Sequence, residues 1–593
     1  MLKKSLAIAC VATLLSACGG GGGGGGGAFP PFPAPAPAPS PAPAPAPAPA
    51  ADTTPPSVVA FNPTASTDVP RNTEISATLS EALLATTVTD SNLRITRLGG
   101  AVPGSLNYDA TKNKISFAPT KALDLLANYT VTAGTGLKDL AGNSLAAEKS
   151  WSFRTADGSW EAPHELDPAT TSSADQAVAA QDGQGNTVVA WTSTITGSNF
   201  EIRTAVQSAS GSWSSASGLS TPGNYSALSP RIGFDGLGNG LAVWIQSGNA
   251  GDAGTEVWSS RFVKGTGWQT PTRLDRTFDT AGYSASLAID ADGNAFAVWG
   301  KRETQYGNSD IWGARFTPGG GWQASTRLGS SANIGTYDQA EQPQVAVDAA
   351  GNAYVLWVQR SSEVPVWVAR YQVGTGWQPA VSLGAVRQGD PHAPRLAVSS
   401  SGRVMALWNS FVYAGGPYRF DLWWSALETP GGSWTPPALL ESEDGGDAKN
   451  QALVADGAGN FHAIWQQSPF EYRSDLLYRR YTPGSGWSTV TTISTTNGDE
   501  FQNRVPSLVA DRNGNLMALW AVFRGTGAAE EGTFARRYVA GEGWRATFRV
   551  GVAGAPPAAS TSLSVQADGT MGAAWMEPAQ FRGDGPILAA RFK

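Results

Sequence analysis

The sequence predicts an all-β protein in which a small β-sandwich precedes an eight-bladed β-propeller. Three observations carry this prediction. The chain of 593 residues contains 70 Gly, 39 Pro and 22 Trp but only 15% charged residues, which is typical of sheets joined by many tight turns. Short apolar segments alternate with turn residues from residue 52 to the end. Beyond residue 157 one such pattern recurs eight times, which indicates a repeat architecture.

The first residues of the chain are expected to be an export signal rather than part of the fold. Lys3 and Lys4 precede an apolar run over 6–15, which is too short to span a bilayer as a helix. The run leads into the sequence Leu-Ser-Ala-Cys that ends at Cys18. This ending resembles the lipobox of bacterial lipoproteins, and the alternative is an ordinary secretory signal with a chance cysteine.

The lipoprotein resemblance implies that residues 1–17 are removed as a signal peptide and that Cys18 is acylated. The membrane would then be a partner through the lipid anchor. By the same resemblance, Gly19 favours the outer membrane, with the rest of the chain facing the periplasm or the cell surface. Cys10 would be lost with the signal peptide, so no disulfide is expected in the mature protein.

Residues 18–51 are expected to form a linker. Nine glycines at 19–27 predict a flexible coil, and the Pro-Ala alternation of 28–51 favours polyproline II. At about 3.1 Å per residue the second stretch spans up to about 75 Å. That length is enough to hold a folded domain away from a membrane surface.

Residues 52–156 show alternating segments over a length typical of a β-sandwich. The predicted strands are 73–79, 92–96, 114–117, 129–132 and 151–154. Several motifs in this stretch resemble bacterial Ig-like domains of S-layer and surface proteins, among them Thr54-Pro55-Pro56, Phe61-Asn62-Pro63, Phe117-Ala118-Pro119, the run 136–143 and Trp151-Ser152-Phe153. The resemblance implies an Ig-like fold with a spacer or presenting role, and it implies no reaction.

The remainder, 157–593, is built from repeats. A turn of the form Asp-x-x-Gly-Asn, or a degenerate copy of it, leads through apolar residues to a tryptophan at intervals of about 55 residues: Trp191, Trp244, Trp299, Trp357, Trp408, Trp465, Trp520 and Trp575. Each repeat contains four strand signals, and its second strand is apolar on both faces, as expected for a sheet packed between two others. Four-stranded sheets repeated radially form a β-propeller.

The ends of this region predict how the ring closes. The last repeat stops at Lys593 after its third strand, whereas a single strand signal over 158–167 precedes the first repeat. The early strand is therefore expected to complete the last sheet.

Functional residues are expected where the repeats differ. Recurring Asp, Trp and Arg positions serve packing, whereas loops between the second and third strands vary. Those loops suit an extracellular glycan or protein ligand through stacking and directed hydrogen bonds. The alternative is ordinary solvated loop polarity. The candidate ligand-binding residues are Arg302, Glu303, Tyr306, Arg360, Tyr418, Arg419, Tyr472 and Arg473.

A second set of candidates is acidic. One aspartate stands before the first strand of most repeats, including Asp338, Asp390, Asp447 and Asp499. Clustered carboxylates favour a hard cation, so Ca²⁺ is a possible cofactor. The alternative is that each aspartate stabilises its own turn. No other cofactor is expected.

Composition narrows the partners and the chemistry. The net charge of -7 disfavours nucleic acid. No catalytic residue is marked: His392 is the only loop histidine, and the turns depart in spacing from the Asp-box of sialidases. The prediction is therefore a monomeric binding or adhesion module on the cell surface. The alternative is a propeller enzyme that acts on extracellular glycans, as a glycoside hydrolase or lyase.

Overall fold

The computed structural model describes most of the chain beyond residue 50. The described residues are 51–167, 174–196, 199–220, 226–247, 254–277, 284–304, 307–329, 339–360, 366–384, 389–412, 419–441, 446–470, 473–495, 502–523, 531–577 and 585–593. Residues 54–593 form one compact unit. Within the described residues no helix has the length and apolar character needed to cross a membrane.

The N-terminal part of this unit is a two-sheet sandwich. One sheet has the order β1 (Val58–Asn62), β2 (Ile75–Leu79), β6 (Lys114–Pro119), β5 (Gly104–Asp109), and the other has the order β4 (Gly100–Ala101), β3 (Leu93–Arg97), β7 (Asn128–Ala133), β8 (Lys149–Arg154). A single 3₁₀ turn, η1, spans Ala85–Thr87. Five of the strands were expected from the sequence, whereas β1, β4 and β5, which lie at sheet edges, were not. The three missed strands contain no fully buried residue, whereas β8, also an edge strand, carries the buried Trp151 and Phe153 and was expected.

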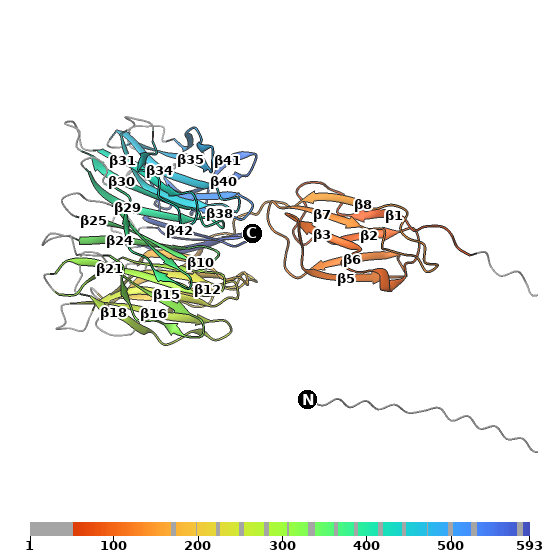
Figure 1. Ribbon diagram of the computed structural model, residues 1–593, viewed down its shortest axis with the longest axis horizontal. Helices are drawn as coiled ribbons and strands as arrows, with labels where there is room; N and C mark the ends of the chain where they lie inside the picture. The colour runs from red at the N-terminus through yellow and green to blue at the C-terminus, as the bar shows by residue number, and fades with distance from the viewer. Residues whose placement is uncertain are drawn as a thin grey trace, which may run out of the picture. The chain divides into compact units, whose positions relative to one another are not determined.

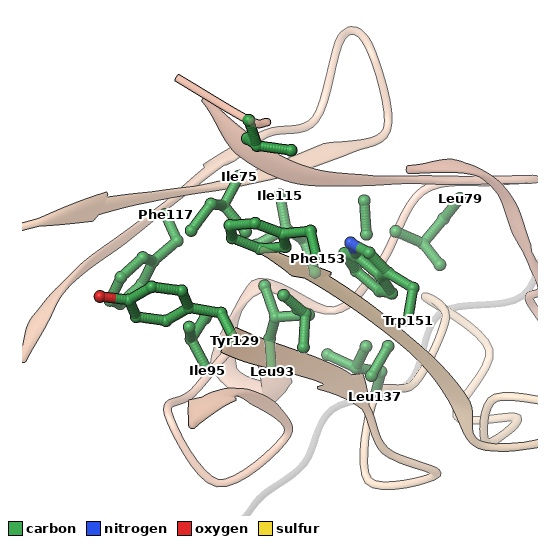
Figure 2. Packing of buried hydrophobic residues seen from close by; sticks show 14 of the residues in the cluster. Ile75, Leu79, Leu93, Ile95, Ile115, Phe117, Tyr129, Leu137, Trp151 and Phe153 are labelled. Carbon is green, nitrogen blue, oxygen red and sulfur yellow. The ribbon is translucent and has the colours of Figure 1, made fainter. Parts of the chain in front are cut away.

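The sandwich core comes from alternating positions of both sheets. Ile75 and Ile115 face Tyr129, Trp151 and Phe153 across the interior, and all five are buried. Figure 2 shows these side chains interdigitating between the two sheets.

The rest of the chain is a succession of sheets that are propeller-like (Figure 1). The first four repeat units comprise β10 (Ala174–Gln181), β11 (Thr187–Thr196), β12 (Asn199–Gln207) and β13 (Ser217–Gly218); β14 (Ala227–Phe234), β15 (Gly240–Ser247), β16 (Thr255–Val263), β17 (Gly267–Trp268) and β18 (Thr272–Thr277); β19 (Ala285–Ile289), β20 (Ala295–Arg302), β21 (Ser309–Thr317), β22 (Gly321–Trp322) and β23 (Thr326–Arg327); and β24 (Gln339–Val347), β25 (Ala353–Arg360), β26 (Val366–Gln372), β27 (Gly376–Trp377) and β28 (Val381–Ser382).

The remaining units comprise β29 (Gly389–Val398), β30 (Val404–Val412), β31 (Arg419–Leu427) and β32 (Ala438–Leu439); β33 (Asp447–Ala455), β34 (Phe461–Phe470), β35 (Arg473–Thr482), β36 (Gly486–Trp487) and β37 (Thr491–Ser494); β38 (Gln502–Ala510), β39 (Leu516–Phe523), β40 (Gly532–Val539) and β41 (Gly543–Arg549); and β42 (Ser560–Val565), β43 (Met571–Met576) and β44 (Ile587–Phe592).

The first strands of successive units contact one another in a cyclic order. β10 contacts β14, each later first strand contacts the next, and β42 contacts β10 again. The last sheet takes its outer strand from the start of the region: β9 (His164–Asp167) pairs antiparallel with β44. Trp160 also forms a bridge with Phe592. This is the pairing that the missing fourth strand of the last repeat predicts.

The recurring aspartates stabilise turns, as the repeat pattern indicates. In the fourth unit Asp348 Oδ1 accepts hydrogen bonds from the amides of Ala350 and Asn352, both at 2.9 Å. Asn352 Nδ2 donates to Asp348 Oδ2, also at 2.9 Å. Both oxygens of this carboxylate thus bind groups of the turn between the first and second strands.

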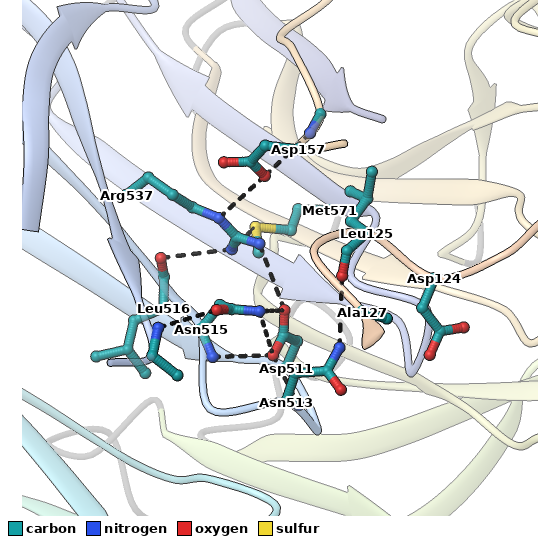
Figure 3. Close-up of polar contacts among 12 residues, drawn as sticks. Asp124, Leu125, Ala127, Asp157, Asp511, Asn513, Asn515, Leu516, Arg537 and Met571 are labelled. Carbon is teal, nitrogen blue, oxygen red and sulfur yellow. Dashed lines mark hydrogen bonds and ion pairs between the residues drawn. The ribbon is translucent and has the colours of Figure 1, made fainter. Parts of the chain in front are cut away.

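The sandwich contacts these same turns of the last two units (Figure 3). The amide of Leu125 donates to the carbonyl of Asp568 at 2.8 Å, and the Leu125 side chain joins the hydrophobic cluster around Met571. The buried Asp124 carboxylate pairs with Arg97 at 2.8 Å and with Arg512 at 2.6 Å. The loops between second and third strands leave the opposite ends of the second strands, so these contacts do not involve them.

Deleting residues 158–167 tests the closing strand. The deletion removes β9, exposes the outer edge of β44 and takes away the buried Leu166. We expect the free energy of unfolding to fall by on the order of 5 kcal/mol, measured by chemical denaturation. The matched control, deletion of linker residues 31–40, should unfold like the parent chain. An unchanged midpoint for the 158–167 deletion would show that this strand does not hold the ring.

Candidate functional site

A cavity of about 450 Å³ lies between the third and fourth repeat units. It is open to solvent, because Thr326, Arg327 and Pro379 on its rim are exposed. The third unit contributes the end of its fourth strand, and the fourth unit contributes its three outer strands. The lining residues are Thr326, Arg327, Leu328, Gly329, Trp357, Gln359, Trp367, Trp377, Gln378, Pro379 and Ala380.

Three tryptophans form the aromatic part of the wall. Trp357 lies on β25 and is 1% exposed, and it is paired in register with Trp367 on β26. Trp377 on β27 opens the fourth strand. Trp367 and Trp377 are half-buried, so part of each indole remains accessible. Accessible indoles in a solvent-open cavity can stack on a ligand of low charge.

One variable repeat position, Gly329, contributes no side chain to the cavity wall. The seventh residue after the Gly-Trp tryptophan is Gly329 in the third unit and Asp167 in the closing strand. Asp167 Oδ2 accepts a hydrogen bond of 2.8 Å from the indole Nε1 of Trp191 in the next unit. Gly329 offers no acceptor, and within the described residues Trp357 Nε1 has no hydrogen-bond partner.

An ion pair stands at the cavity edge. Arg327 Nη2 lies 2.6 Å from Asp310 Oδ2, while Asp310 Oδ1 is buried and has no partner among the described residues. Burial, together with the charge of Glu303, raises the pKa of Asp310, and Arg327 opposes that rise. The pair supplies directed donors and acceptors beside the aromatic wall.

A second arrangement of acids lies in the fifth unit. Glu441 occupies the same repeat position as Gly329, and its Oε1 accepts the amide of Leu422 at 2.8 Å. Its Oε2 is buried without a partner in the described part of the chain. Burial, reinforced by the negative charge of Asp421, raises the pKa of Glu441 to about 8. A carboxyl group that stays protonated near neutral pH can act as a general acid.

The predicted loop residues fall on four different units. Glu303 interacts electrostatically with Asp310 at the cavity edge, and Arg302, which ends β20, donates its amide to Thr277. Arg419 pairs with Asp421 at 3.1 Å, next to Glu441. Arg360 and Arg473 lie at strand ends, with side chains outside the described set. Tyr306, Tyr418 and Tyr472 lie outside the described residues, as does Cys18.

The predicted cation site is described at one position only. The Asp447 carboxylate accepts the amide of Phe420 at 3.1 Å and pairs with Lys449 at 3.3 Å. Asp338 and Asp499 lie outside the described residues, and the side chain of Asp390 does so too. The Ca²⁺ site therefore stays a prediction.

Sequence reasoning did not select the cavity residues or Glu441. The signal that could have found them is a position that occurs in every repeat but holds a different type of residue from one repeat to the next. The seventh residue after the Gly-Trp tryptophan is, unit by unit from the closing strand, Asp167, Ser220, Asp275, Gly329, Gly384, Glu441, Ser494 and Gly551. A packing position keeps its residue type, so this variation points to a role outside packing.

A comparison with family models identifies the fold of the sandwich. Residues 52–155 match the model of the bacterial Ig-like domain. No curated protein matches the chain. Among solved structures, it is similar to an alpha-L-arabinanase of Penicillium chrysogenum complexed with arabinobiose, with 16% identity over 49% of this chain and 88% of that one and a TM-score of 0.33.

Two further solved structures resemble the chain. One is an ulvan lyase, with 13% identity over 59% of this chain and 89% of that one and a TM-score of 0.37. The other is a protein of unknown function from Dyadobacter fermentans, with 12% identity over 57% and 98% and a TM-score of 0.33. These likenesses are distant, and it is the family model that supports the Ig-like assignment of the sandwich.

The raised pKa of Glu441 predicts how stability depends on pH. The pKa of this carboxyl is about 8 in the folded state, whereas the ordinary pKa of a glutamate is 4.5. Its contribution to stability is therefore complete at low pH and is lost as the pH rises through about 8. The side chain of Glu441→Gln cannot ionise, so the free energy of unfolding of this variant should fall less steeply than that of wild type between pH 5 and 8. The two slopes should differ by at most about 1.4 kcal/mol per pH unit.

Urea unfolding at several pH values measures this slope. Glu148→Gln, which alters an exposed glutamate paired with Arg94, is the matched control and should keep the wild-type slope. Equal slopes for Glu441→Gln and wild type would mean that Glu441 titrates alike in the folded and unfolded chains.

Proposed function

We propose that this protein is a bacterial outer-membrane lipoprotein whose propeller region binds extracellular glycans. The observation that carries the glycan proposal is the solvent-open cavity between the third and fourth units, with its tryptophan wall and its Arg327–Asp310 pair. Sugars present apolar C–H faces that stack on indoles, and hydroxyl groups that bond to directed charged and amide groups. The cavity combines both kinds of contact.

The proposed architecture has four parts: a signal peptide (1–17), a linker (18–51), an Ig-like domain (52–156) and an eight-bladed propeller (157–593). Eight fully buried tryptophans, one in each repeat, support the blade count. The cyclic contacts of the first strands and the β9–β44 pairing support closure of the ring.

A monomeric ring with the Ig-like domain at the turns between first and second strands leaves the other face free for a ligand. Asp124, Arg512 and the Arg71–Asp568 pair at 2.6 Å support this placement. The Ig-like domain then acts as a rigid spacer between the linker and the propeller. An extracellular protein is the alternative ligand for the free face.

Two substitutions in the cavity test glycan binding. Trp367→Ala removes part of the aromatic wall and should weaken binding tenfold or more, since a stacking platform contributes about 1–3 kcal/mol. Gly329→Asn should also weaken binding, by filling the cavity. A Cβ at Gly329 meets only ordinary contacts, 3.7 Å from Asp310 Oδ1 and 3.8 Å from Trp357, so this variant should fold normally. The measurement is calorimetric titration with neutral and acidic oligosaccharides.

The matched control is Trp423→Ala. Trp423 holds the same register opposite Trp408 as Trp367 holds opposite Trp357, but it does not line the cavity. If an oligosaccharide binds wild type, Gly329→Asn and Trp367→Ala with the same affinity, the cavity is not its site.

A glycan-active enzyme is the second candidate, and Glu441 favours it. Its buried carboxyl, its raised pKa and the neighbouring Asp421 provide a proton donor beside a second acid. New reducing ends or unsaturated products in the same incubations, absent with Glu441→Gln, would support this candidate. Their absence with wild type leaves binding as the function.

Membrane attachment rests on Cys18. Cys18→Ser should abolish acylation, so the protein should leave the membrane fraction and lose the mass of the lipid. Cys10→Ser is the matched control, because Cys10 lies within the segment that is removed. A Cys18→Ser protein that stays in the membrane fraction with unchanged mass would contradict lipidation at this residue.

A further inference from the structure

The closing strand shows which groups meet at the repeat position that Gly329 occupies in the third unit. There the residue is Asp167, and its Oδ2 accepts hydrogen bonds from Trp191 Nε1 at 2.8 Å and from Ser193 Oγ at 2.9 Å. Ser193 is the second residue after Trp191 on β11. Both donors therefore come from the second strand of the following unit and converge on one oxygen.

The fourth unit presents the corresponding donors to a position that has no oxygen. Trp357 and Gln359 on β25 correspond to Trp191 and Ser193 on β11, and both line the cavity. Trp357 is 1% and Gln359 is 5% exposed. Within the described residues, neither Trp357 Nε1 nor Gln359 Nε2 has a hydrogen-bond partner. The Nε1 edge of the indole lies next to Gly329, since Trp357 Cζ2 is 3.8 Å from the position that a Cβ at Gly329 would take.

The amide of Gln359 is the more informative of the two donors, because several other repeat tryptophans also have an indole without a partner in the described part of the chain. Glutamine at the same place in the sixth unit is bonded at both ends. Gln467 Oε1 accepts the indole of Trp465 at 2.9 Å, and Gln467 Nε2 donates to the carbonyl of Gly446 at 3.1 Å. A buried amide without an acceptor is costly, so the cavity lacks an oxygen beside Gln359.

An acceptor without a donor lies beside these two groups. Asp310 is 7% exposed, and its Oδ1 has no partner among the described residues. That oxygen is 3.7 Å from the position that a Cβ at Gly329 would take. The other oxygen of Asp310 pairs with Arg327 at 2.6 Å. Two donors and one acceptor thus stand close to Gly329, all buried and all unsatisfied.

The closing unit also contains a cation that the fourth unit does not repeat. Arg203 Nη1 lies 3.5 Å from Asp167 Oδ1, and Arg203 is paired in register with Trp191. The residue paired in the same way with Trp357 is Trp367. An indole therefore stands where the closing unit holds the arginine that compensates its carboxylate.

Arg327 on the cavity rim does not replace that arginine, because it already pairs with Asp310. Glu303 adds a further negative charge that acts on Asp310. A carboxylate beside Gly329 would be removed from water next to these acids without a cation of its own, which is unfavourable. A neutral oxygen can accept the two donors without that cost.

We propose, as an extension that rests on the proposed glycan binding, that this cavity selects neutral saccharides over acidic ones. One sugar hydroxyl oxygen takes the place that Asp167 Oδ2 holds in the closing unit and accepts from Trp357 Nε1 and Gln359 Nε2. The same or a neighbouring hydroxyl donates to Asp310 Oδ1. Because a hydroxyl both donates and accepts, sugar hydroxyls satisfy all three groups without a cation, while the C–H face of the ring lies against the tryptophan wall.

Calorimetric titration of the full chain tests this selectivity with named probes. The neutral probes are cellotriose, xylotriose and galactotriose, and the acidic probes are trigalacturonate and trimannuronate. The tightest neutral probe should bind at least about tenfold more tightly than either acidic one, and Trp367→Ala should weaken its binding. An acidic probe that binds as tightly as the neutral ones, and that Trp367→Ala also weakens, overturns the selectivity but leaves glycan binding intact. If no probe binds, both proposals are wrong.

Gln359→Leu removes one of the two donors and keeps a side chain of similar size. It should weaken binding of the neutral probe about fivefold, as expected for one hydrogen bond. Without ligand it should not lower the melting temperature, because its Nε2 has no partner to lose. The matched control Gln467→Leu loses bonds at both ends of its amide, so it should melt lower and bind normally. A Gln359→Leu protein that melts lower and binds like wild type would show that the amide serves the fold, which overturns the proposal.

Gly329→Asn and Gly329→Asp test the charge preference without any ligand. The two side chains have nearly the same size, and each brings an oxygen to the unpartnered donors. Gly329→Asn should melt at or above the wild-type temperature, whereas Gly329→Asp should melt lower than Gly329→Asn at about pH 8. The difference should shrink as the pH falls towards about 4, because the new carboxyl is then protonated. The same two substitutions at Gly319, which is exposed and has no neighbour within 4 Å of a Cβ, should show no such pH dependence. Equal melting temperatures for Gly329→Asn and Gly329→Asp at about pH 8 would mean that the cavity tolerates a negative charge, and the selectivity proposal would be wrong.

Discussion

The fold depends on the burial of the second strand of every repeat. That strand is apolar on both faces and carries a tryptophan that is at most 1% exposed in each unit, from Trp191 to Trp575. A sheet of this kind cannot end in water, so each one needs a neighbour on both sides. The requirement is met by cyclic contacts of the first strands and by β9, which comes from the start of the region to pair with β44. Closing so long a loop adds little further entropy cost, because that cost grows only slowly with length.

The sequence was sufficient to predict the features that recur in every repeat. It was not sufficient to predict the features that occur once. The turn aspartates, the buried tryptophans and the closing strand were predicted because each leaves a periodic mark. The strands β1, β4 and β5 were missed, since they contain no fully buried residue. The cavity was missed for a different reason: its lining comes from two repeats, for example from Gly329 and from Trp357, which lies 28 residues further along the chain. A pattern within one short sequence segment cannot predict a cavity that forms between two repeats.

Among the described residues, the Ig-like domain contacts the repeats at the turns between first and second strands and not at the loops between second and third strands. Asp124 binds Arg97 of its own domain and Arg512 of the propeller region; the Asp124 and Arg97 side chains are buried, whereas that of Arg512 stays partly exposed. Removing one partner of such a group leaves the others charged and unsatisfied. The contact therefore favours one orientation of the domain. It engages the turns between first and second strands, where the aspartates already use their oxygens, and it leaves the variable ends of the strands to ligands.

The same reasoning explains why charge is found where the repeat does not need it. At the end of the fourth strand, Asp167 bonds to the indole of Trp191, Gly329 lines a cavity and burial raises the pKa of Glu441 to about 8. The repeat does not require an acid at this position, because other units hold serine or glycine there. Glu441 Oε2 is buried without a partner among the described residues, which is unfavourable for a carboxylate. A buried acid where serine or glycine serves in other units is a physical reason to look for a ligand there rather than at the repeated aspartates.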